Sequence, residues 1–406
     1  MTAMRPSGRF PAQAANTPGH LLNLIRSRDN WTRQQLLTAT GLSRTTLFSR
    51  LGQLFRSGYA YESGAARSTG GRPSSLVRFE DRGRVVLVID LGHRHGRIAI
   101  TTVGGTTLRE TRLSIDIAQP PKTLLPTIYD QAQHLLDTGT DEKLVGVGVA
   151  VPGPVSPVTG HLTETTIMPG WHHYPLNAEM ADRWGVPVLL ENDARAYALG
   201  ESVERPDASP LVAVKYANGI GAGIVLDGQL LCGVGGAAGD IGHIRITDAR
   251  GRRCRCGRNG CLAAYASGHA LLRQLRRPTD TTVDDLATTM ATHQPTETAV
   301  RAAATLLGRT LASLVATLNP QLIVLGGVLG RTPAVVEEVR SQIHTLAIDR
   351  VTTPLSVTAS TAHHPVGTGL TALVTGHVYA PDNVDATLTA QPTTADTRST
   401  PPHRAP

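Results

Sequence analysis

The chain has 406 residues, of which 40% are hydrophobic and 4% aromatic, and its formal net charge is +7. This length predicts two or three domains with substantial hydrophobic cores. There is no run of about 18 apolar residues, as a membrane-spanning helix would need, and no apolar stretch follows the first charges, as in a secretory signal. Four cysteines are too few for a disulfide scaffold in so long a chain. We therefore expect a cytoplasmic protein with no membrane partner.

Positive charge is concentrated near the N-terminus. Residues 1–84 contain 13 Arg, no Lys and 4 acidic residues, a net charge of +9, whereas the rest of the chain sums to −2. This asymmetry is expected when only one part of a chain meets nucleic-acid phosphates. A solvated arginine-rich segment would have the same composition, so charge alone leaves both interpretations open.

Three helices are predicted between residues 17 and 57. The apolar stripe of the first consists of Leu21, Leu22, Leu24 and Ile25. Thr32 followed by Gln35 predicts a capping box that opens a second helix, which ends near Gly41. Ser43 is the expected N-cap of a third helix with an apolar stripe at Leu47, Leu51 and Leu54. Two helices joined by a short turn form a helix-turn-helix, whose second helix reaches base edges with its N-terminal residues.

The third predicted helix and the segment after it carry the candidate DNA contacts. On the helix these are Ser43, Arg44, Thr45, Thr46 and Arg50. Strands near residues 59–62 and 75–79 predict a wing hairpin, and Arg72 at its basic tip is suited to a narrow minor groove. A three-helix packing module with a polar loop is the alternative. The agreement of helix order, capping, basic face and basic hairpin favours a winged helix-turn-helix at residues 17–80 that binds a double-stranded DNA operator.

The body of the chain, residues 84–380, contains apolar strands that end in polar or glycine-rich segments. The strand at 84–90 ends in Asp90 and leads through a glycine turn to a strand at 98–102. Another strand delivers Glu191, Asn192 and Asp193 into a helix at 194–201. Polar residues at the carboxyl end of a strand are placed to meet a ligand. Residues 1–16 and 381–406, rich in Pro, Ala, Gln or Thr, are expected to be disordered.

Three cysteines close together predict a metal site. Cys254, Cys256 and Cys261 lie within eight residues of sequence, and thiolates so spaced can surround one tetrahedral ion. His243 and Cys232 are both chemically acceptable as the fourth ligand. A closed site with four protein ligands is typical of a structural zinc ion.

Taken together, these motifs resemble the ROK family over about residues 84–380. The segments that match family signatures, in order, are VPGPVSPVTG, LLENDARAYALGE, GAAGDIGH, CRCGRNGC and LNPQLIVLGG. A winged helix before this domain is the layout of the family's xylose and N-acetylglucosamine repressor branch. The resemblance implies an α/β actin-like ATPase (ribonuclease H-like) fold of two lobes with a sugar site in the cleft, and a homodimer or homotetramer. It also implies that His243 completes a structural Zn²⁺ site with Cys254, Cys256 and Cys261.

The resemblance further implies an effector site of Asn192, Asp193, Asp240 and His243. Asp193 matches the catalytic base of the family's sugar kinases. The two phosphate loops differ from those of the kinases, because His93 and Arg94 replace Gly and Thr, and the expected Gly-Thr-Gly begins instead with Ala217 and Asn218. We therefore expect no enzymatic activity, with Asp193 at a vestigial base position.

The sugar pocket is itself altered. Asp240 and Ala263 stand where the family has glutamates, and the family asparagine shortly before Trp171 is missing. Because a site for hydroxyl groups discriminates through paired polar groups, such losses change the ligand or weaken its binding. The residues that would compensate are His172, His173 and Arg195, although we favour surface positions for all three.

These expectations combine into a sequence-specific DNA-binding transcriptional regulator. We expect a repressor of carbohydrate-related genes, controlled by a sugar or sugar-phosphate effector. The alternative is an ATP-dependent sugar kinase with a regulatory DNA-binding head. A third hypothesis is a ligand-independent DNA-binding protein whose body only dimerises.

Overall fold

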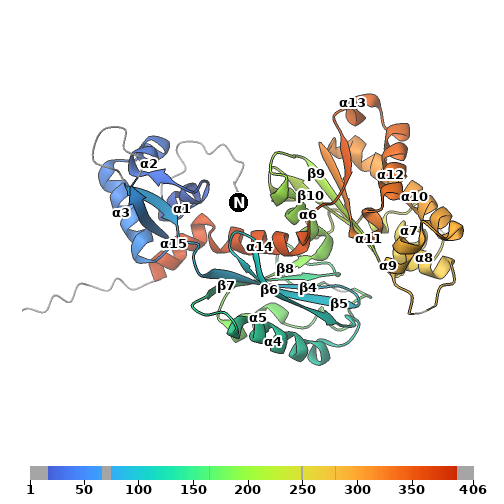
Figure 1. Ribbon diagram of the computed structural model, residues 1–406, viewed down its shortest axis with the longest axis horizontal. Coiled ribbons are helices and arrows are strands. Elements are labelled where there is room, and N and C mark those ends of the chain that lie inside the picture. The colour runs from blue at the N-terminus through green and yellow to red at the C-terminus, as the bar shows by residue number, and fades with distance from the viewer. Residues whose placement is uncertain (1–16, 66–74, 164, 248–249, 279, 391–406) are drawn as a thin grey trace, which may run out of the picture. The chain divides into compact units, whose positions relative to one another are not determined.

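The computed structural model describes residues 17–65, 75–163, 165–247, 250–278 and 280–390. These residues form two compact units (Figure 1). The larger unit spans residues 81–376, and the smaller one combines residues 17–80 with residues 377–390. Arg72 lies outside the described residues.

The smaller unit contains helices and a three-stranded antiparallel sheet of order β1-β3-β2. Its elements are α1 (Pro18–Arg26), β1 (Trp31–Thr32), α2 (Arg33–Thr40), α3 (Arg44–Arg56), β2 (Ala60–Ala65), β3 (Ser75–Phe79) and α15 (Pro381–Ala390). The stripes predicted for α1 and α3 face inward, since Leu21, Leu22 and Ile25 and then Leu47, Leu51 and Leu54 are buried. The three helices and the hairpin therefore have the order expected of a winged helix-turn-helix.

The ends of α2 and α3 follow from local side-chain chemistry. Thr32 Oγ1 accepts a hydrogen bond from Gln35 N at 3.1 Å, and Gln35 Oε1 accepts one from Thr32 N at 2.9 Å. Gly41 ends α2 at φ 67°, a left-handed conformation that glycine adopts without strain. Ser43 Oγ accepts from Thr46 N at 3.1 Å and so caps α3. The predicted capping box, stop and N-cap are confirmed.

Residues 381–390 differ from the predicted disordered tail, because they form α15 on the smaller unit. Asp385 Oδ1 accepts a hydrogen bond from Gly19 N at 2.7 Å. A Cβ on Gly19 would lie 2.1 Å from the carbonyl oxygen of Pro381, so glycine permits this close approach of α1 and α15. Composition alone suggested disorder, but α1 supplies the packing partner that a short, weakly apolar helix needs. The predicted effector domain also extended past the boundary of its unit at Gly376.

The larger unit has two lobes, and the first is built on a five-stranded sheet of order β6-β5-β4-β7-β8. Its elements are β4 (Arg84–Leu91), β5 (His95–Thr102), β6 (Thr107–Ser114), α4 (Pro121–Asp137), β7 (Lys143–Val151), α5 (Leu176–Trp184), β8 (Val188–Asn192) and α6 (Asp193–Glu204). The strands β4, β5 and β6 pair antiparallel, whereas β7 and β8 continue the sheet in parallel. Helices α4 and α5 cover one face of the sheet (Figure 1).

The second lobe repeats this arrangement with a sheet of order β11-β10-β9-β12-β13. Its elements are β9 (Leu211–Tyr216), β10 (Ile220–Leu226), β11 (Gln229–Leu230), the 3-10 turn η1 (Ile241–His243), α7 (Ala263–Ala266), α8 (Gly268–Gln274), α9 (Val283–Thr289), α10 (Gln294–Leu318), β12 (Leu322–Gly326), α11 (Gly327–Gly330), α12 (Pro333–Leu346), α13 (Asp349–Thr352) and β13 (Ser356–Ala359). The last helix of the larger unit, α14 (Pro365–Val378), returns to the first sheet, where Thr371 Oγ1 lies 2.8 Å from Thr101 Oγ1 of β5. Again three antiparallel strands are followed by two parallel ones. This duplicated order confirms the predicted two-lobed α/β fold.

Helix α10 forms much of the core of the second lobe. Its residues Val300, Leu307 and Leu311 are fully buried among the side chains of that core. It is also the one helix in the described part of the chain that is long and apolar enough, by length and composition, to cross a membrane. Its packing against α12 accounts for that apolar character.

Tyr379, just after the last turn of α14, tests the contribution of the C-terminal segment to the smaller unit. Its ring is fully buried and packs edge-on against Tyr59 and Phe79, with centroid distances of 6.3 and 4.9 Å. We expect Tyr379→Ala to lower the free energy of unfolding by about 3–5 kcal/mol, the usual cost of truncating a buried aromatic. Denaturant unfolding of the full chain measures this, with the exposed Thr387→Ala as control. Equal stability of the two variants would contradict the packing role of residues 377–390.

Candidate functional site

The first turn of α3 presents polar side chains to solvent. Arg44, Thr45 and Ser49 are exposed, and Arg44 follows the capping residue directly. Ser43 and Thr46 interact with each other, since their hydroxyl oxygens lie 2.8 Å apart, and so their first role is to cap the helix. Arg50 is half-buried and has a partner within the protein. Of the predicted DNA contacts, Ser43, Arg44 and Thr45 are exposed, whereas Thr46 and Arg50 are half-buried.

Phe48 shares this surface and was not among the predicted contacts. Its side chain is 43% exposed. The guanidinium of Arg33 lies 4.4 Å from the centroid of the Phe48 ring, and Arg33 also pairs with Glu62 of β2 at 2.7 Å. These contacts hold one face of the ring. The only sequence signal for this exposed position is that Phe48, although apolar, lies outside the stripe formed by Leu47 and Leu51.

The three clustered cysteines and His243 come together in the second lobe. One potential ligand atom from each of the four residues lies within 4.8 Å of all the others. The distance from Cys256 Sγ to Cys261 Sγ is 3.7 Å, as is that from Cys254 Sγ to His243 Nδ1. A tetrahedral zinc ion with Zn–S bonds of about 2.3 Å separates its ligand atoms by roughly 3.5–3.8 Å. The donor set and its spacing therefore fit a metal ion, and the sulfur atoms are too far apart for a disulfide.

The local backbone explains how these four residues meet. His243 ends the turn η1, and Cys261 directly precedes Leu262 and α7. Between them, the isolated bridge from Arg245 to Cys261 closes the loop that carries the other two cysteines. Burial raises the pKa of the Cys254 thiol and raises that of Cys261 to about 12. A bound cation would reverse this effect, because metal ligation requires the thiolate form.

Cys232, the other candidate for the fourth ligand, lies elsewhere. It is half-buried, and its Sγ–H points to the carbonyl oxygen of Leu230 at 3.8 Å. Burial raises the pKa of its thiol, with a further contribution from Glu191. The structure thus groups His243, and not Cys232, with the three clustered cysteines.

Asn192 and Asp193 lie where β8 passes into α6. The Asn192 side-chain oxygen accepts hydrogen bonds from Ala194 N at 3.0 Å and Arg195 N at 3.2 Å, so Asn192 is the N-cap of the helix. Asp193 is the first residue of α6. Its carboxylate Oδ2 instead accepts a hydrogen bond from Lys215 Nζ at 2.7 Å. The pairing of Lys215 with Asp193 could not be predicted from the sequence, because Lys215 lies on β9 in the other lobe.

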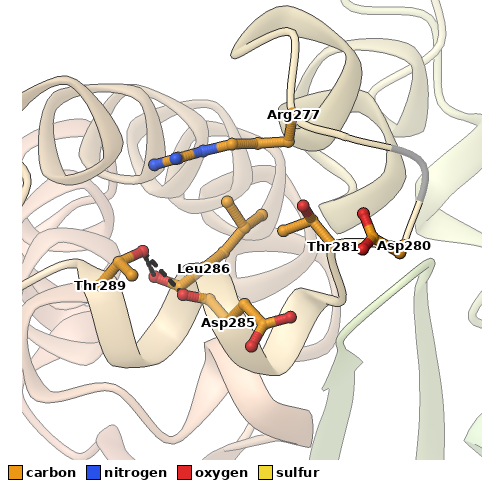
Figure 2. Close-up of a pocket in the computed structure, with 6 residues that line it drawn as sticks. All are labelled: Arg277, Asp280, Thr281, Asp285, Leu286 and Thr289. Atoms are coloured by element: carbon orange, nitrogen blue, oxygen red, sulfur yellow. Dashed lines mark hydrogen bonds between the residues drawn. The ribbon is translucent and has the colours of Figure 1, made fainter.

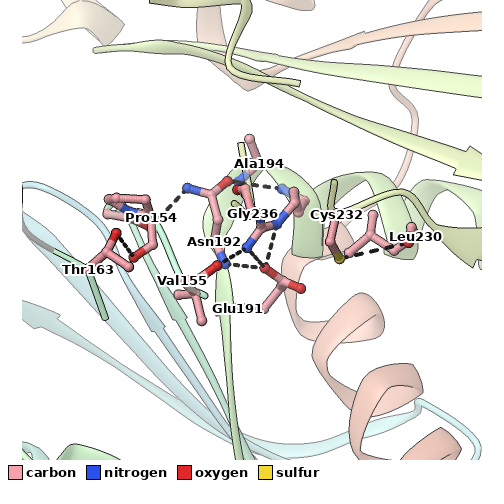
Figure 3. Close-up of polar contacts among 11 residues, drawn as sticks. Pro154, Val155, Thr163, Glu191, Asn192, Ala194, Leu230, Cys232 and Gly236 are labelled. Carbon is pink, nitrogen blue, oxygen red and sulfur yellow. Dashed lines mark hydrogen bonds and ion pairs between the residues drawn. The ribbon is translucent and has the colours of Figure 1, made fainter. Parts of the chain in front are cut away.

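Arg195 is an internal residue, and the surface position that we favoured for it is wrong. It is 2% exposed, and its Nε donates to Glu191 Oε1 at 2.6 Å. Figure 3 labels Glu191 together with Val155 and Gly236. Arg195 also donates to the carbonyl oxygens of Val155, at 3.0 Å, and Gly236. It therefore ties the loop after β7 to the glycine-rich loop of the second lobe. Burial raises the pKa of Glu191, and the nearby Arg195 charge opposes that rise.

The remaining predicted cleft residues differ in accessibility. Asp240 and His243 are exposed at the end of the glycine-rich loop, and His243, Arg195 and Asp193 lie close enough to act on the Asp240 charge. His173 is exposed, as we favoured, whereas His172 is half-buried. The two rings lie against each other at a centroid distance of 3.8 Å and are tilted by 48°. The described side chains offer no hydrogen-bond partner to His172 Nδ1.

The glycines that follow β9 allow β10 to pack closely on α6, in addition to any role they have in binding a ligand. A Cβ on Gly221 would lie 2.9 Å from the Cβ of Ala194, and one on Gly223 would lie 2.4 Å from that of Ala198. Both contacts belong to α6. These two glycines are therefore required for the close approach of β10 to the helix, whereas Gly219, in the loop itself, faces open space.

Two surface pockets lie apart from the predicted effector residues. The first, beside α9, is lined by Arg277, Asp280, Thr281, Asp285, Leu286 and Thr289 (Figure 2). Asp285 already forms a capping box with Thr282, so its carboxylate has a structural role. The second lies between β6 and α4 and includes Arg94. Neither pocket contains Asn192, Asp193, Asp240 or His243.

Comparison with known proteins agrees with this architecture. Over 330 residues the chain is 27% identical to the "Xylose repressor" of Bacillus subtilis, covering 80% of this chain and 85% of the relative. It is 28% identical over 283 residues to a "Glucokinase" of Halalkalibacterium halodurans, covering 61% of this chain and 86% of the relative. The crystal structure of a ROK family transcriptional regulator, a homologue of the E. coli MLC protein, superimposes with a TM-score of 0.77 at 24% identity, covering 92% of this chain and 98% of that one.

The family assignment follows from the match along the chain. The sequence model of the ROK family matches residues 86–377, which include both lobes, the β8–α6 junction and the cysteine cluster. This match covers well over half of the sequence, so the chain belongs to the ROK family.

Proposed function

We propose that this protein is a sequence-specific DNA-binding transcriptional regulator, a repressor of carbohydrate-related genes whose ROK domain binds a sugar or sugar-phosphate effector. The observation that carries this proposal is the exposed first turn of α3, with Arg44, Thr45 and Phe48 on one accessible surface. Arginine recognises guanine edges, and an aromatic ring contacts the thymine methyl group. The similarity to xylose repressors supports the same role.

We also propose the oligomeric state of the protein, how its effector controls DNA binding, and its cellular location. A homodimer or homotetramer would place two such helices in successive major grooves of a palindromic operator. An effector controls DNA affinity if it binds the DNA-free and DNA-bound states with different affinities. Such a regulator works in the cytoplasm.

Variants of α3 test DNA recognition. An operator is first selected from random DNA with the unaltered protein, and affinities are then measured by fluorescence anisotropy. Because each direct base contact contributes about 1–3 kcal/mol, we expect Arg44→Ala and Phe48→Ala each to weaken binding about 10- to 100-fold. Arg56→Ala, at the other end of the helix, removes the same charge as Arg44→Ala and controls for general electrostatics. Equal effects of Arg44→Ala and Arg56→Ala would refute base contact by the first turn.

We propose that His243, Cys254, Cys256 and Cys261 hold a structural zinc ion. The four-ligand set leaves no open position for a reacting water, so the ion would stabilise the loop and not activate substrate. The loop it stabilises leads directly from the glycine-rich segment that contacts Arg195.

Metal analysis of cysteine variants tests this site. The purified full chain should contain about one zinc per chain, and Cys254→Ser or Cys261→Ser should lose most of it because a tetrahedral site needs all its ligands. Cys232→Ser provides the matched control and should keep its zinc. Loss of zinc from the Cys232 variant, or its retention in the Cys254 variant, would assign the site to different ligands.

The alternative, a sugar kinase, is favoured by the carboxylate of Asp193 at the carboxyl end of β8 and by the 28% identity to a glucokinase. Against it stand the side chains of His93, Arg94 and Asn218 in the two phosphate loops and the engagement of Asp193 by Lys215. A general base must be free to accept the proton of the attacking hydroxyl. We therefore propose that the ROK domain is not an enzyme.

A phosphorylation assay separates regulator from kinase. With MgATP and a panel of hexoses, pentoses and amino sugars, a coupled assay of ADP release should show no turnover above a protein-free blank. Turnover that disappears in Asp193→Asn would overturn the proposal. Turnover that survives in this variant would identify a contaminating kinase.

A further inference from the structure

Lys215 and Asp193 form an ion pair between the two lobes of the larger unit. Lys215 stands near the end of β9, in the second sheet, and Asp193 begins α6 directly after the first sheet. Their side chains are 20% and 18% exposed, and the distance from Nζ to Oδ2 is 2.7 Å. An ion pair so shielded from water is worth more than a surface pair, but it is stable only if both charges remain compensated.

Asp90 belongs to the same cluster. It lies near the end of β4, and its Oδ1 is shielded from solvent and has no hydrogen-bond partner among the described residues. Burial raises the pKa of Asp90, whereas the positive charge of Lys215 opposes the rise. Asp90 is therefore close enough to Lys215 for their charges to interact, whereas the direct contact of Lys215 is with Asp193.

The charge of Lys215 depends on these two neighbours. Burial alone would lower the pKa of Lys215, but the Asp193 and Asp90 carboxylates outweigh burial and the net pKa is raised. His93 does not supply a second cation, because burial and the nearby Arg255 charge lower its pKa. Arg97, opposite Asp90 in the sheet, is paired with Glu110 at 3.1 Å. The charge of Lys215 thus acts on both acidic residues, and it lowers the pKa of Asp90 more than the charges of His95 and Arg97 do.

The choice of lysine at this position is informative. The chain uses arginine for nearly all its positive charge, with lysine only at positions 122, 143 and 215. Lys122 and Lys143 are exposed, so Lys215 is the one lysine that is partly shielded from solvent by surrounding residues. A compact ammonium suits a space between two carboxylates better than the broad guanidinium of arginine does.

We propose that Lys215 is the built-in counter-ion of Asp193: its ammonium takes the cation position beside Asp193 and near Asp90, excludes a divalent metal from that position, and keeps Asp193 from acting as an acid or a base. The inference deepens the proposed non-catalytic role of the cleft and rests on that proposal. Carboxylate oxygens are the preferred ligands of Mg²⁺ and Mn²⁺, so the same two side chains without lysine would attract such an ion. The cleft then binds its effector without a metal.

Titration with Mn²⁺ alone tests this inference on the zinc-loaded full chain. Free Mn²⁺ is measured by electron paramagnetic resonance. The unaltered protein should show only weak surface binding, and so should Lys143→Ala, which removes an exposed lysine. Lys215→Met keeps the length of the side chain without its charge, and it should gain one Mn²⁺ site at least about tenfold tighter than surface binding. The double variant Asp193→Asn/Lys215→Met should lose that site again.

Each outcome decides the inference. A tight Mn²⁺ site in the unaltered protein that Asp193→Asn removes would overturn it, as would a folded Lys215→Met variant that gains no site. Zinc content and melting temperature establish that the variants are folded. If Lys215→Met fails to fold, Lys215→Gln takes its place, and the titration of the unaltered protein stands without any variant. Because the experiment uses neither DNA, sugar nor ATP, its failure would leave the DNA-binding proposal untouched.

Discussion

Helix α6 is buried on every side, and the arrangement of the larger unit depends on that burial. Its residues from Ala194 to Ser202 are all buried. Strand β10 approaches one side through Gly221 and Gly223, and α14 approaches another, where a Cβ on Gly369 would lie 1.9 Å from the carbonyl oxygen of Ala196. Small residues on both partners are the only way to bring backbones so close. Since α6 begins at the carboxyl end of β8, this packing also fixes the position of Asp193.

A buried side-chain network also fixes the first turn of α6. Arg195 points out of the first turn of α6 into a network of Glu191 and two backbone carbonyls from different loops. Removing one partner of a buried ion pair leaves an uncompensated charge, which typically costs several kcal/mol. Through these bonds Arg195 joins the loop after β7 and the glycine-rich loop to the β8–α6 junction.

Local chemistry explains which parts of the structure could be predicted. Thr32 with Gln35, Gly41 and Ser43 specify helix ends through neighbours three residues away, and the cysteines meet His243 within a short loop. Predictions failed where contacts are distant in sequence. Arg195 looked like a surface residue because nothing nearby indicates that α6 is covered on all sides, and the pairing of Lys215 with Asp193 joins two lobes. Helix α15 was missed because its stabilising partner, α1, lies at the opposite end of the chain.

The participation of residues 377–390 in the smaller unit affects how the protein is made. During synthesis α1, α2 and α3 leave the ribosome first, but the segment that contributes Tyr379 and Asp385 follows only after both lobes of the larger unit. Until then the surface of α1 that contacts Pro381 remains uncovered. The smaller unit is therefore completed last. A nascent chain that lacks residues 377–390 has an incomplete smaller unit, which is the unit proposed to bind DNA. The order of translation thus delays the complete DNA-binding unit until the proposed effector domain exists.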